Sequence, residues 1–397
     1  NARSRGYLSY AYNYKPKFIF DMVVKLMSDG LNMSRRIRRT PYTDSVEQLG
    51  VRGFSVVNHM LLPKAFQPTV EEDYWHLREH VQIWDVSCQR QVEITGKDAT
   101  KLIQLMTPRD ISRCSIGQCM YVPIIDSDAG LINDPVLLKL DDNHFWLSIA
   151  DSDVLLYAKG LAIGKGFDVI VDEPDVSPLA VQGPKAEKLL TQIFGSNIGD
   201  IGFFKFGWIN FCGTKQLIAR SGYSRQGGFE IYLKGSHLGK KLWDTIWNAG
   251  KKFNILPGCP NLIERIEGGL FSYGNEMTRA NNPLEIGLEK YCTLDGSIDF
   301  IGREKLQRIA KNGINQQIKG VLFDGDKCPT CAVPWPVTVG SQKVGAITSA
   351  IWSPRLKSNI GLSMIDSNFW LQGQSVSVHM PNEIVCNGKV VDTPFKD

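Results

Sequence analysis

The segment SGYSRQGGFEIYL, residues 221–233, has the pattern of a β-strand that follows a glycine-containing turn. Alternate side chains of a strand point to opposite faces, so Phe229 and Ile231 lie on an apolar face. Glu230 and Tyr232 lie on the other face. A carboxylate beside a phenol, opposite an apolar face, fits two interpretations: a solvated outer face of a sheet, or the wall of a ligand cavity.

The rest of the chain indicates an α+β fold. QVEITG (91–96) alternates like a strand, and KDATKLIQLMT after it has apolar residues at helical spacing. LINDPVLLKLDDNHFWLSIA (131–150) has the pattern of two strands around a turn, and VSPLAVQGPKAEKLLTQIF that of a strand, a break and a helix. Strands and helices follow each other irregularly, which favours α+β over a doubly wound sheet.

A helix is predicted over NLIERIEGGLFSYGNEM, with Asn261 as its N-cap after a proline. Its inner stripe is expected to consist of Leu262, Ile266, Leu270 and Tyr273.

Domain organisation follows from the change of character after FIGREKL (300–306). Five or six short strands with no helix between them predict a C-terminal β-barrel or sandwich over residues 310–390. Residues 33–309 are expected to form two interleaved α+β domains. The chain opens with Asn, and Met33 precedes the basic stretch SRRIRR, so residues 1–32 are expected to be an extension outside the fold.

Charge and composition exclude several classes of protein. Residues 1–39 hold nine of the 45 Lys and Arg but only two of the 41 Asp and Glu, so the remaining chain is slightly acidic and does not suit nucleic acid. The apolar run FIFDMVVKLM is interrupted by charges and too short for a bilayer, so no membrane association is expected. The nine scattered cysteines favour a reducing, cytoplasmic location. Cys328 and Cys331 lack a second pair of ligands nearby, so no metal is predicted.

Seven stretches, in this order, resemble the aminomethyltransferase (glycine-cleavage T-protein) family. They are WDVSCQRQVEITGKDA (84–99), GQCMYVPIIDSDAGLINDPVLL (117–138), LAVQGPKA (179–186), RSGYSRQGGFEIY (220–232), ERIEGGLFSYGNEM with NPLEIGL (264–288), DFIGREKL (299–306) and VGAITSAIWSPRLKSNIGLSMI (344–365). The resemblance implies a three-domain cloverleaf around a central folate site, with tetrahydrofolate as cofactor and the small β-barrel at the C-terminus.

Within that family, VNHMLLP (57–63), EEDYWHLRE (71–79) and ADSDVLLYAKG (150–160) are similar to the branch of dimethylsulfoniopropionate demethylases. A T-protein usually has Asp-Asp where this chain has Asn133-Asp134, and Gly-Tyr-Thr-Gly-Glu over residues 222–226. These departures favour the demethylase branch, whose substrate is a small sulfonium molecule.

The resemblance also implies roles for single residues. Asp134 occupies the position of the catalytic aspartate; from its residue type alone it is equally a turn or cap residue. Glu230 would hydrogen-bond the pterin ring, Arg265 would contact the folate, and Tyr223 would pack beside it. Without the resemblance, Arg265 has the pattern of a surface arginine whose aliphatic part covers apolar surface.

Four residues are candidates for binding the substrate. The demethylase branch is expected to place a serine, here Ser148, near the substrate; otherwise it is a half-buried strand residue. A sulfonium cation favours aromatic faces, for which Trp146, Tyr223 and Tyr232 are the candidates.

The reaction that this resemblance implies is transfer of a methyl group from sulfur to a folate nitrogen. The sulfonium is already a good leaving group, so alignment and exclusion of water suffice without a covalent intermediate. The chain has no recognisable triad, and its six histidines show no metal spacing. Two alternatives stay open: an aminomethyltransferase that works with a lipoylated carrier, and a folate-binding protein without transferase activity. A homodimer is a possible assembly.

Overall fold

The computed structural model describes residues 36–151 and 153–396. The described residues from Arg39 onward form one compact unit. The predicted extension over residues 1–32 lies outside the described residues and stays a prediction. Within the described part of the chain, no helix has the length and apolar character needed to cross a membrane.

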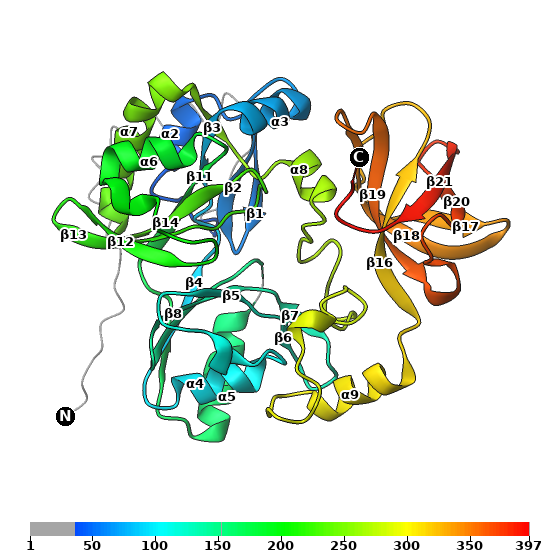
Figure 1. Ribbon diagram of the computed structural model, residues 1–397, viewed down its shortest axis with the longest axis horizontal. Helices are drawn as coiled ribbons and strands as arrows, with labels where there is room; N and C mark the ends of the chain where they lie inside the picture. The colour runs from blue at the N-terminus through cyan, green and yellow to red at the C-terminus, as the bar shows by residue number, and fades with distance from the viewer. Residues whose placement is uncertain (1–35, 152, 397) are drawn as a thin grey trace. The chain divides into compact units, whose positions relative to one another are not determined.

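The elements confirm the α+β class (Figure 1). The described helices are α2 (Thr43–Gln48), α3 (Val70–Glu79), α4 (Ala99–Met106), α5 (Val154–Lys165), α6 (Ala186–Phe194), α7 (Gly239–Gly250), α8 (Leu262–Glu267) and α9 (Arg303–Asn312). Two small hairpin sheets pair β1 (Gly53–Val57) with β2 (Met60–Ala65) and β6 (Ile124–Ile125) with β7 (Leu131–Asn133).

A five-stranded antiparallel sheet forms the first layer. Its order is β10 (Ile170–Asp172), β4 (Gln91–Thr95), β9 (His144–Ser148), β8 (Val136–Asp141) and β5 (Cys119–Tyr121). Helices α4 and α5 cover one face, where their apolar residues join those of β4 and β9 in one core. The turn predicted within residues 131–150 joins β8 to β9, and the short strand β7 is a third strand in the segment where two were predicted.

The strand that contains Glu230 lies inside a six-stranded sheet. The order is β12 (Phe206–Phe211), β13 (Thr214–Ala219), β14 (Gly228–Lys234), β11 (Val176–Gln182), β3 (Val81–Asp85) and β15 (Ile255–Gly258), with only β15 parallel to its neighbour. Helices α6 and α7 pack on the apolar face of this sheet, which holds Phe229 and Ile231. Glu230 and Tyr232 on the opposite face are only 6% and 1% exposed, so the solvated-face interpretation is wrong.

The C-terminal segment closes into the predicted β-barrel. The strands follow the order β16 (Gln316–Phe323), β19 (Ser358–Asp366), β18 (Gln342–Ser353), β17 (Trp335–Val339), β20 (Ser375–His379) and β21 (Val385–Val391). Closure removes the unpaired edges that an open sheet of these strands would expose. Helix α9 precedes the barrel and ends at Asn312 (Figure 1).

The helix predicted from Asn261 is much shorter than expected. Asn261 caps it, since its side chain accepts hydrogen bonds from the backbone N–H groups of Ile263 and Glu264. The helix ends at Glu267, because Gly268 and Gly269 follow and Gly269 adopts a φ of 60°. The predicted inner stripe is therefore wrong for Leu270 and Tyr273, which lie in the loop after the helix.

Candidate active site

Glu230 and Ser221 form the first part of the site. Strand β14 carries Glu230 between Ala180 of β11 and Ala219 of β13. The Ser221 hydroxyl donates a hydrogen bond to Glu230 Oε2. Burial raises the pKa of Glu230 above its usual value, and the bond from Ser221 opposes that rise. The carboxylate is thus held in a dry environment that favours a hydrogen-bond donor.

Tyr232 and Trp146 bring β14 and β9 together. Their ring centroids lie 6.2 Å apart with planes tilted by 36°. Trp146 Nε1 donates to Glu93 Oε1 at 2.8 Å, which fixes the orientation of the indole. The Tyr232 hydroxyl is buried beside the Ser148, Ser221 and Glu230 side chains and makes no hydrogen bond of standard geometry within the described residues. Such a hydroxyl is costly unless a ligand or water satisfies it.

Ser148 lies at the end of β9 and is buried. Its hydroxyl accepts a hydrogen bond from Gln91 Nε2 at 3.1 Å. Ser148 lies two residues after Trp146 on the same strand. A serine hydroxyl both accepts and donates, so it can still donate a hydrogen bond while it accepts the one from Gln91.

Asp134 follows β7 and makes the second part of the site. Tyr121 on β5 donates its phenol hydrogen to Asp134 Oδ2 at 2.8 Å, whereas the buried Oδ1 has no hydrogen-bond partner in the described chain. Burial raises the pKa of Asp134 to about 7, partly offset by the bond from Tyr121, and the nearby carboxylate of Glu276 raises it further. A carboxylate with one oxygen fixed and one open can accept a proton or hydrogen bond at neutral pH.

Asn133 explains how the backbone presents Asp134. Its buried side-chain Oδ1 accepts hydrogen bonds from the backbone N–H of Asp134 at 2.9 Å and of Ala150 at 3.3 Å. The amide oxygen thus ties the strand before Asp134 to the end of β9. Asn133 therefore has a structural role next to the candidate catalytic residue.

Tyr223 and Arg265 lie beside each other near Asp134. The Tyr223 hydroxyl donates to the carbonyl oxygens of Leu270 and Phe271, at 3.2 and 2.6 Å. Burial raises the pKa of the Tyr223 phenol, while the positive charge of Arg265 opposes this effect.

Arg265 itself is buried and engaged in protein contacts. Its guanidinium donates to Glu276 Oε2 at 2.7 Å, to Ser349 Oγ at 2.7 Å and to the Leu270 carbonyl at 3.2 Å. It therefore joins α8 to barrel strand β18. The surface interpretation of Arg265 is wrong, and a contact with folate stays a prediction.

The polar atoms without protein partners fit a cofactor with ring N–H groups. Asp134 Oδ1 is an acceptor, the Tyr232 hydroxyl is a donor and acceptor, and Glu230 lies next to the Tyr232 hydroxyl. A pterin ring offers adjacent donors that carboxylates bind well. No hydrogen bond joins Asp134 directly to Glu230 in the part of the chain that the structure describes.

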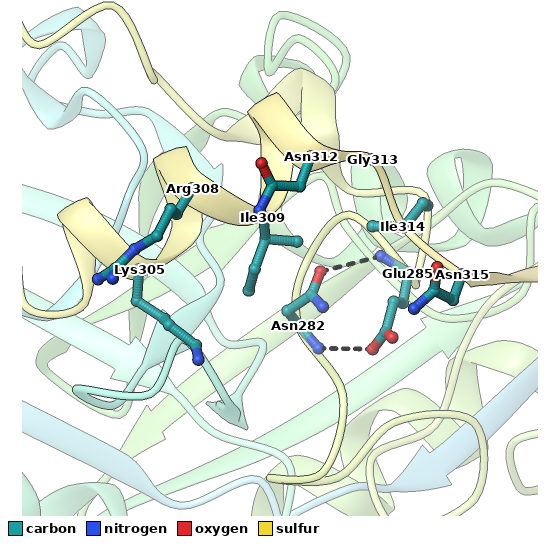
Figure 2. Close-up of a pocket in the computed structure, with 9 residues that line it drawn as sticks. All are labelled: Asn282, Glu285, Lys305, Arg308, Ile309, Asn312, Gly313, Ile314 and Asn315. Atoms are coloured by element: carbon teal, nitrogen blue, oxygen red, sulfur yellow. Dashed lines mark hydrogen bonds between the residues drawn. The ribbon is translucent and has the colours of Figure 1, made fainter.

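A surface pocket of about 340 Å³ lies apart from these residues, at the C-terminal end of α9 (Figure 2). Its lining includes Lys305, Arg308 and Glu285, and Figure 2 shows Asn282 hydrogen-bonded to Glu285. None of the predicted site residues lines it, so it does not define the active site.

The sequence reasoning missed Tyr121, Ser221 and Glu276. All three stand in motifs that carried the family resemblance, but each has its partner on another element. Their contacts come from tertiary packing, for which the local pattern holds no signal.

Comparison with known families identifies the class of protein. The GCVT N-terminal domain family matches residues 42–296, and the glycine cleavage T-protein C-terminal barrel domain matches residues 317–397. The chain belongs to the aminomethyltransferase (glycine-cleavage T-protein) family, as the motifs predicted. Tetrahydrofolate is the cofactor of this family.

Individual relatives agree with this assignment. The chain is 48% identical over 349 residues to the dimethylsulfoniopropionate demethylase DmdA of Ruegeria pomeroyi, covering 88% of this chain and 95% of the relative. It is 33% identical over 340 residues to an aminomethyltransferase of Clostridium botulinum, covering 84% and 90%. The crystal structure of the glycine cleavage system aminomethyltransferase T from Bartonella henselae superposes with a TM-score of 0.82 at 20% identity, over 91% and 98% of the two chains. The last comparison confirms the T-protein fold.

Proposed function

We propose that the protein is a tetrahydrofolate-dependent methyltransferase that demethylates dimethylsulfoniopropionate to methylthiopropionate, giving 5-methyl-tetrahydrofolate. The observation that carries this proposal is the 48% identity, over nearly the whole of both chains, to a dimethylsulfoniopropionate demethylase. The same proposal places the enzyme in the cytoplasm.

Roles for the site residues follow from their surroundings. Glu230, buried and hydrogen-bonded by Ser221, would hold the pterin ring. Tetrahydrofolate supplies the nitrogen that accepts the methyl group. Asp134 would orient that nitrogen and hold or accept its proton at the open Oδ1. Its pKa of about 7 suits a group that must bind and release a proton near neutral pH.

The aromatic pair Trp146–Tyr232 supports a cationic substrate. Aromatic faces attract sulfonium and ammonium cations by about 0.5–2 kcal/mol each, more when water is excluded. Both side chains are almost fully buried, so a cation between their strands and the folate would be desolvated. Ser148 beside them would orient the substrate through its hydroxyl.

The alternative functions make different products. An aminomethyltransferase would transfer a methylene group from an aminomethylated lipoyl carrier, and it is supported by relatives that are 30–33% identical. A folate-binding protein without transferase activity would have no need for the buried, half-satisfied Asp134.

The decisive experiment is incubation of the purified protein with tetrahydrofolate and dimethylsulfoniopropionate. We expect equal amounts of methylthiopropionate and 5-methyl-tetrahydrofolate, identified by mass spectrometry. Glycine betaine as the methyl donor is the matched control for sulfonium over ammonium. Formation of methylene-tetrahydrofolate from an aminomethylated carrier, with no product from the sulfonium, would replace this proposal by the aminomethyltransferase alternative.

A further inference from the structure

The loop of residues 221–227 is held on its sheet side by Gln182. Gln182 Nε2 donates to the Ser221 carbonyl at 3.1 Å, and its Oε1 accepts from the Ser224 hydroxyl at 2.7 Å. A Cβ atom at Gly222, where φ is 149°, would collide with this amide. Gln182 is only 1% exposed, so one end of the loop is fixed at the end of β11.

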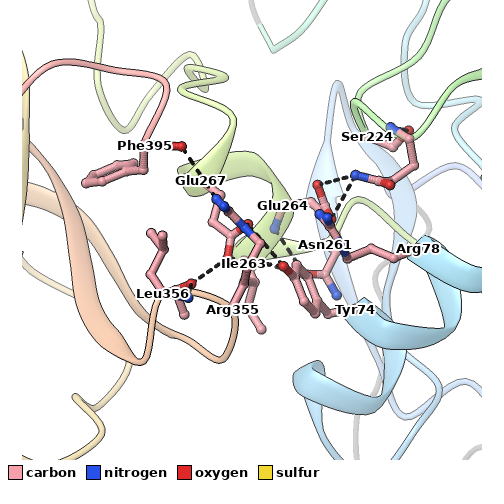
Figure 3. A network of polar contacts seen from close by, with 12 residues as sticks. Tyr74, Arg78, Ser224, Asn261, Ile263, Glu264, Glu267, Arg355, Leu356 and Phe395 are labelled. Carbon is pink, nitrogen blue, oxygen red and sulfur yellow. Dashed lines mark hydrogen bonds and ion pairs between the residues drawn. The ribbon is translucent and has the colours of Figure 1, made fainter. Parts of the chain in front are cut away.

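On its other side the loop is bound to helix α8. Gln226 Nε2 lies 3.1 Å from both carboxylate oxygens of Glu264. Glu264 is 2% exposed and also accepts from Arg78 Nη1 of α3 at 2.9 Å. Figure 3 shows Glu264 and Arg78 joined on one side of α8, while Glu267 on the same helix binds Arg355 on the other. The Gln226 amide thus links the 221–227 loop to the partly buried ion pair of Arg78 and Glu264.

Between these two anchors the loop carries residues of the candidate site. Ser221 donates to Glu230, and Tyr223 is hydrogen-bonded to the backbone that follows α8. Displacing the loop would therefore disturb the hydrogen bond to Glu230 and move the Tyr223 ring. Neither Gln226 nor Glu264 has a direct contact with Glu230, Tyr232 or Asp134 among the contacts of the described residues.

We propose that Gln226 and Glu264 form an amide–carboxylate latch that positions the 221–227 loop for folate binding and that requires an uncharged donor at residue 226. Both are positioning residues, and their effect on folate rests on the proposed function. A glutamate at residue 226 would bring a second carboxylate to within hydrogen-bond distance of Glu264, and two such groups cannot both stay ionised at low cost.

The charged groups around Glu264 determine how the contact between residues 226 and 264 would depend on pH in the Gln226→Glu variant. Arg78 and Tyr74 face it from α3, and Glu267 lies one turn along α8. Burial raises the pKa of Glu264, whereas Arg78 and Gln226 oppose that rise. In Gln226→Glu the two carboxylates would share a proton at low pH and repel at high pH, so the latch would close only in acid.

The first test is amide hydrogen exchange of residues 221–227 in the free protein, which needs no ligand. For Gln226→Glu we expect loss of protection at about pH 8 and partial recovery at about pH 5.5, because protonation restores a donor. The double variant Gln226→Glu/Glu264→Gln keeps one amide and one carboxylate with their positions exchanged, and should regain protection at both pH values. Gln48→Glu, on an exposed part of α2, controls for the added charge. Unchanged protection in Gln226→Glu overturns the latch.

A neutral variant covers failure of Gln226→Glu to fold. Gln226→Met removes the donor without adding charge, so its loop should lose protection at every pH; a fully protected loop would contradict the proposal. The second readout is the tetrahydrofolate Kd, which we expect to rise roughly 10-fold in Gln226→Glu at about pH 8 and to recover in the double variant. If the wild-type protein bound no tetrahydrofolate, the proposed function would fail while the exchange data would still decide the latch.

Discussion

Tyr121 donates a 2.8 Å hydrogen bond to one carboxylate oxygen of Asp134, while the other oxygen of Asp134 is buried with no partner among the described residues. The two carboxylate oxygens of Asp134 therefore differ in their hydrogen bonding. One is fixed by Tyr121, and the other has no hydrogen-bond partner in the described part of the chain. The hydrogen bond from Tyr121 orients the Asp134 carboxylate. Burial raises its pKa to about 7.

Replacing Asp134 by Asn should lower kcat by a factor on the order of 10² to 10⁴ and change the tetrahydrofolate Kd far less. The amide cannot accept a proton, but its oxygen can still take the hydrogen bond from Tyr121. Single-turnover methyl transfer and folate titration on one preparation measure the two effects. Unchanged turnover would remove Asp134 from the catalytic role.

The raised pKa of Asp134 predicts an effect on stability with a definite sign. Its unfolded pKa is about 3.9, so the folded protein holds this proton more tightly than the unfolded chain does. The contribution of Asp134 to the free energy of unfolding is therefore largest below about pH 4. It falls as the pH rises towards about 7. Asp134→Asn, which cannot ionise, should have a higher Tm than the wild type at about pH 8, and the difference should shrink at about pH 5. A Tm difference that does not depend on pH would contradict the assignment.

Tyr121→Phe should weaken catalysis through Asp134. The bond from Tyr121 lowers the pKa of Asp134, so its loss should raise that pKa further and shift the acid side of the kcat profile to higher pH. At neutral pH we expect a loss of roughly 10-fold. Tyr157→Phe is the matched control, because it removes a phenol that donates to the Ile125 carbonyl rather than to Asp134. A pH profile identical to that of the wild type would show that Tyr121 does not act on Asp134.

Glu230→Gln should weaken tetrahydrofolate binding by about 1.5–3 kcal/mol, and Glu230→Ala should weaken it more. The carboxylate lies buried beside the Ser221 hydroxyl, so a neutral amide would replace a charged acceptor in a dry environment. Calorimetric titration gives the Kd of each variant. Equal affinities in all three proteins would assign Glu230 a purely structural role in β14.

Much of this architecture could be predicted because it rests on local periodicity. The alternation around Glu230 gave the correct strand and face, and the closely spaced strands with no α-helix between them, which begin at β16, gave the barrel. The helix predicted from Asn261 extends well beyond the observed one. Its apolar residues continue at helical spacing, but Gly268 and Gly269 end the helix.

The missed contacts have a common physical cause. Tyr121 meets Asp134 across two strands, and Arg265 binds Ser349, 84 residues further along the chain. Such pairs depend on how strand pairing and the packing of α8 on the barrel bring distant residues together, which the local sequence pattern does not encode. The extension over residues 1–32, the domain limits and the homodimer stay predictions.

Arg265 gives the last prediction, because its structural and ligand-binding roles can be separated. Its guanidinium pairs with Glu276, whose side chain is fully buried. Arg265→Met should lower the free energy of unfolding by about 3–5 kcal/mol, since it leaves the Glu276 carboxylate buried and uncompensated. Adding Glu276→Gln removes that charge and should recover most of the loss, measured by urea denaturation.

The double variant Arg265→Met/Glu276→Gln then reports on folate alone. If Arg265 contacts the cofactor, this stable protein should bind tetrahydrofolate at least about 10-fold more weakly than the wild type, since a charged hydrogen bond is worth about 1.5–3 kcal/mol. Arg355→Met is the matched control: it breaks the ion pair with Glu267 on the same helix, so it should lose stability and keep its folate affinity. Wild-type affinity in the double variant would restrict Arg265 to joining α8 with the barrel.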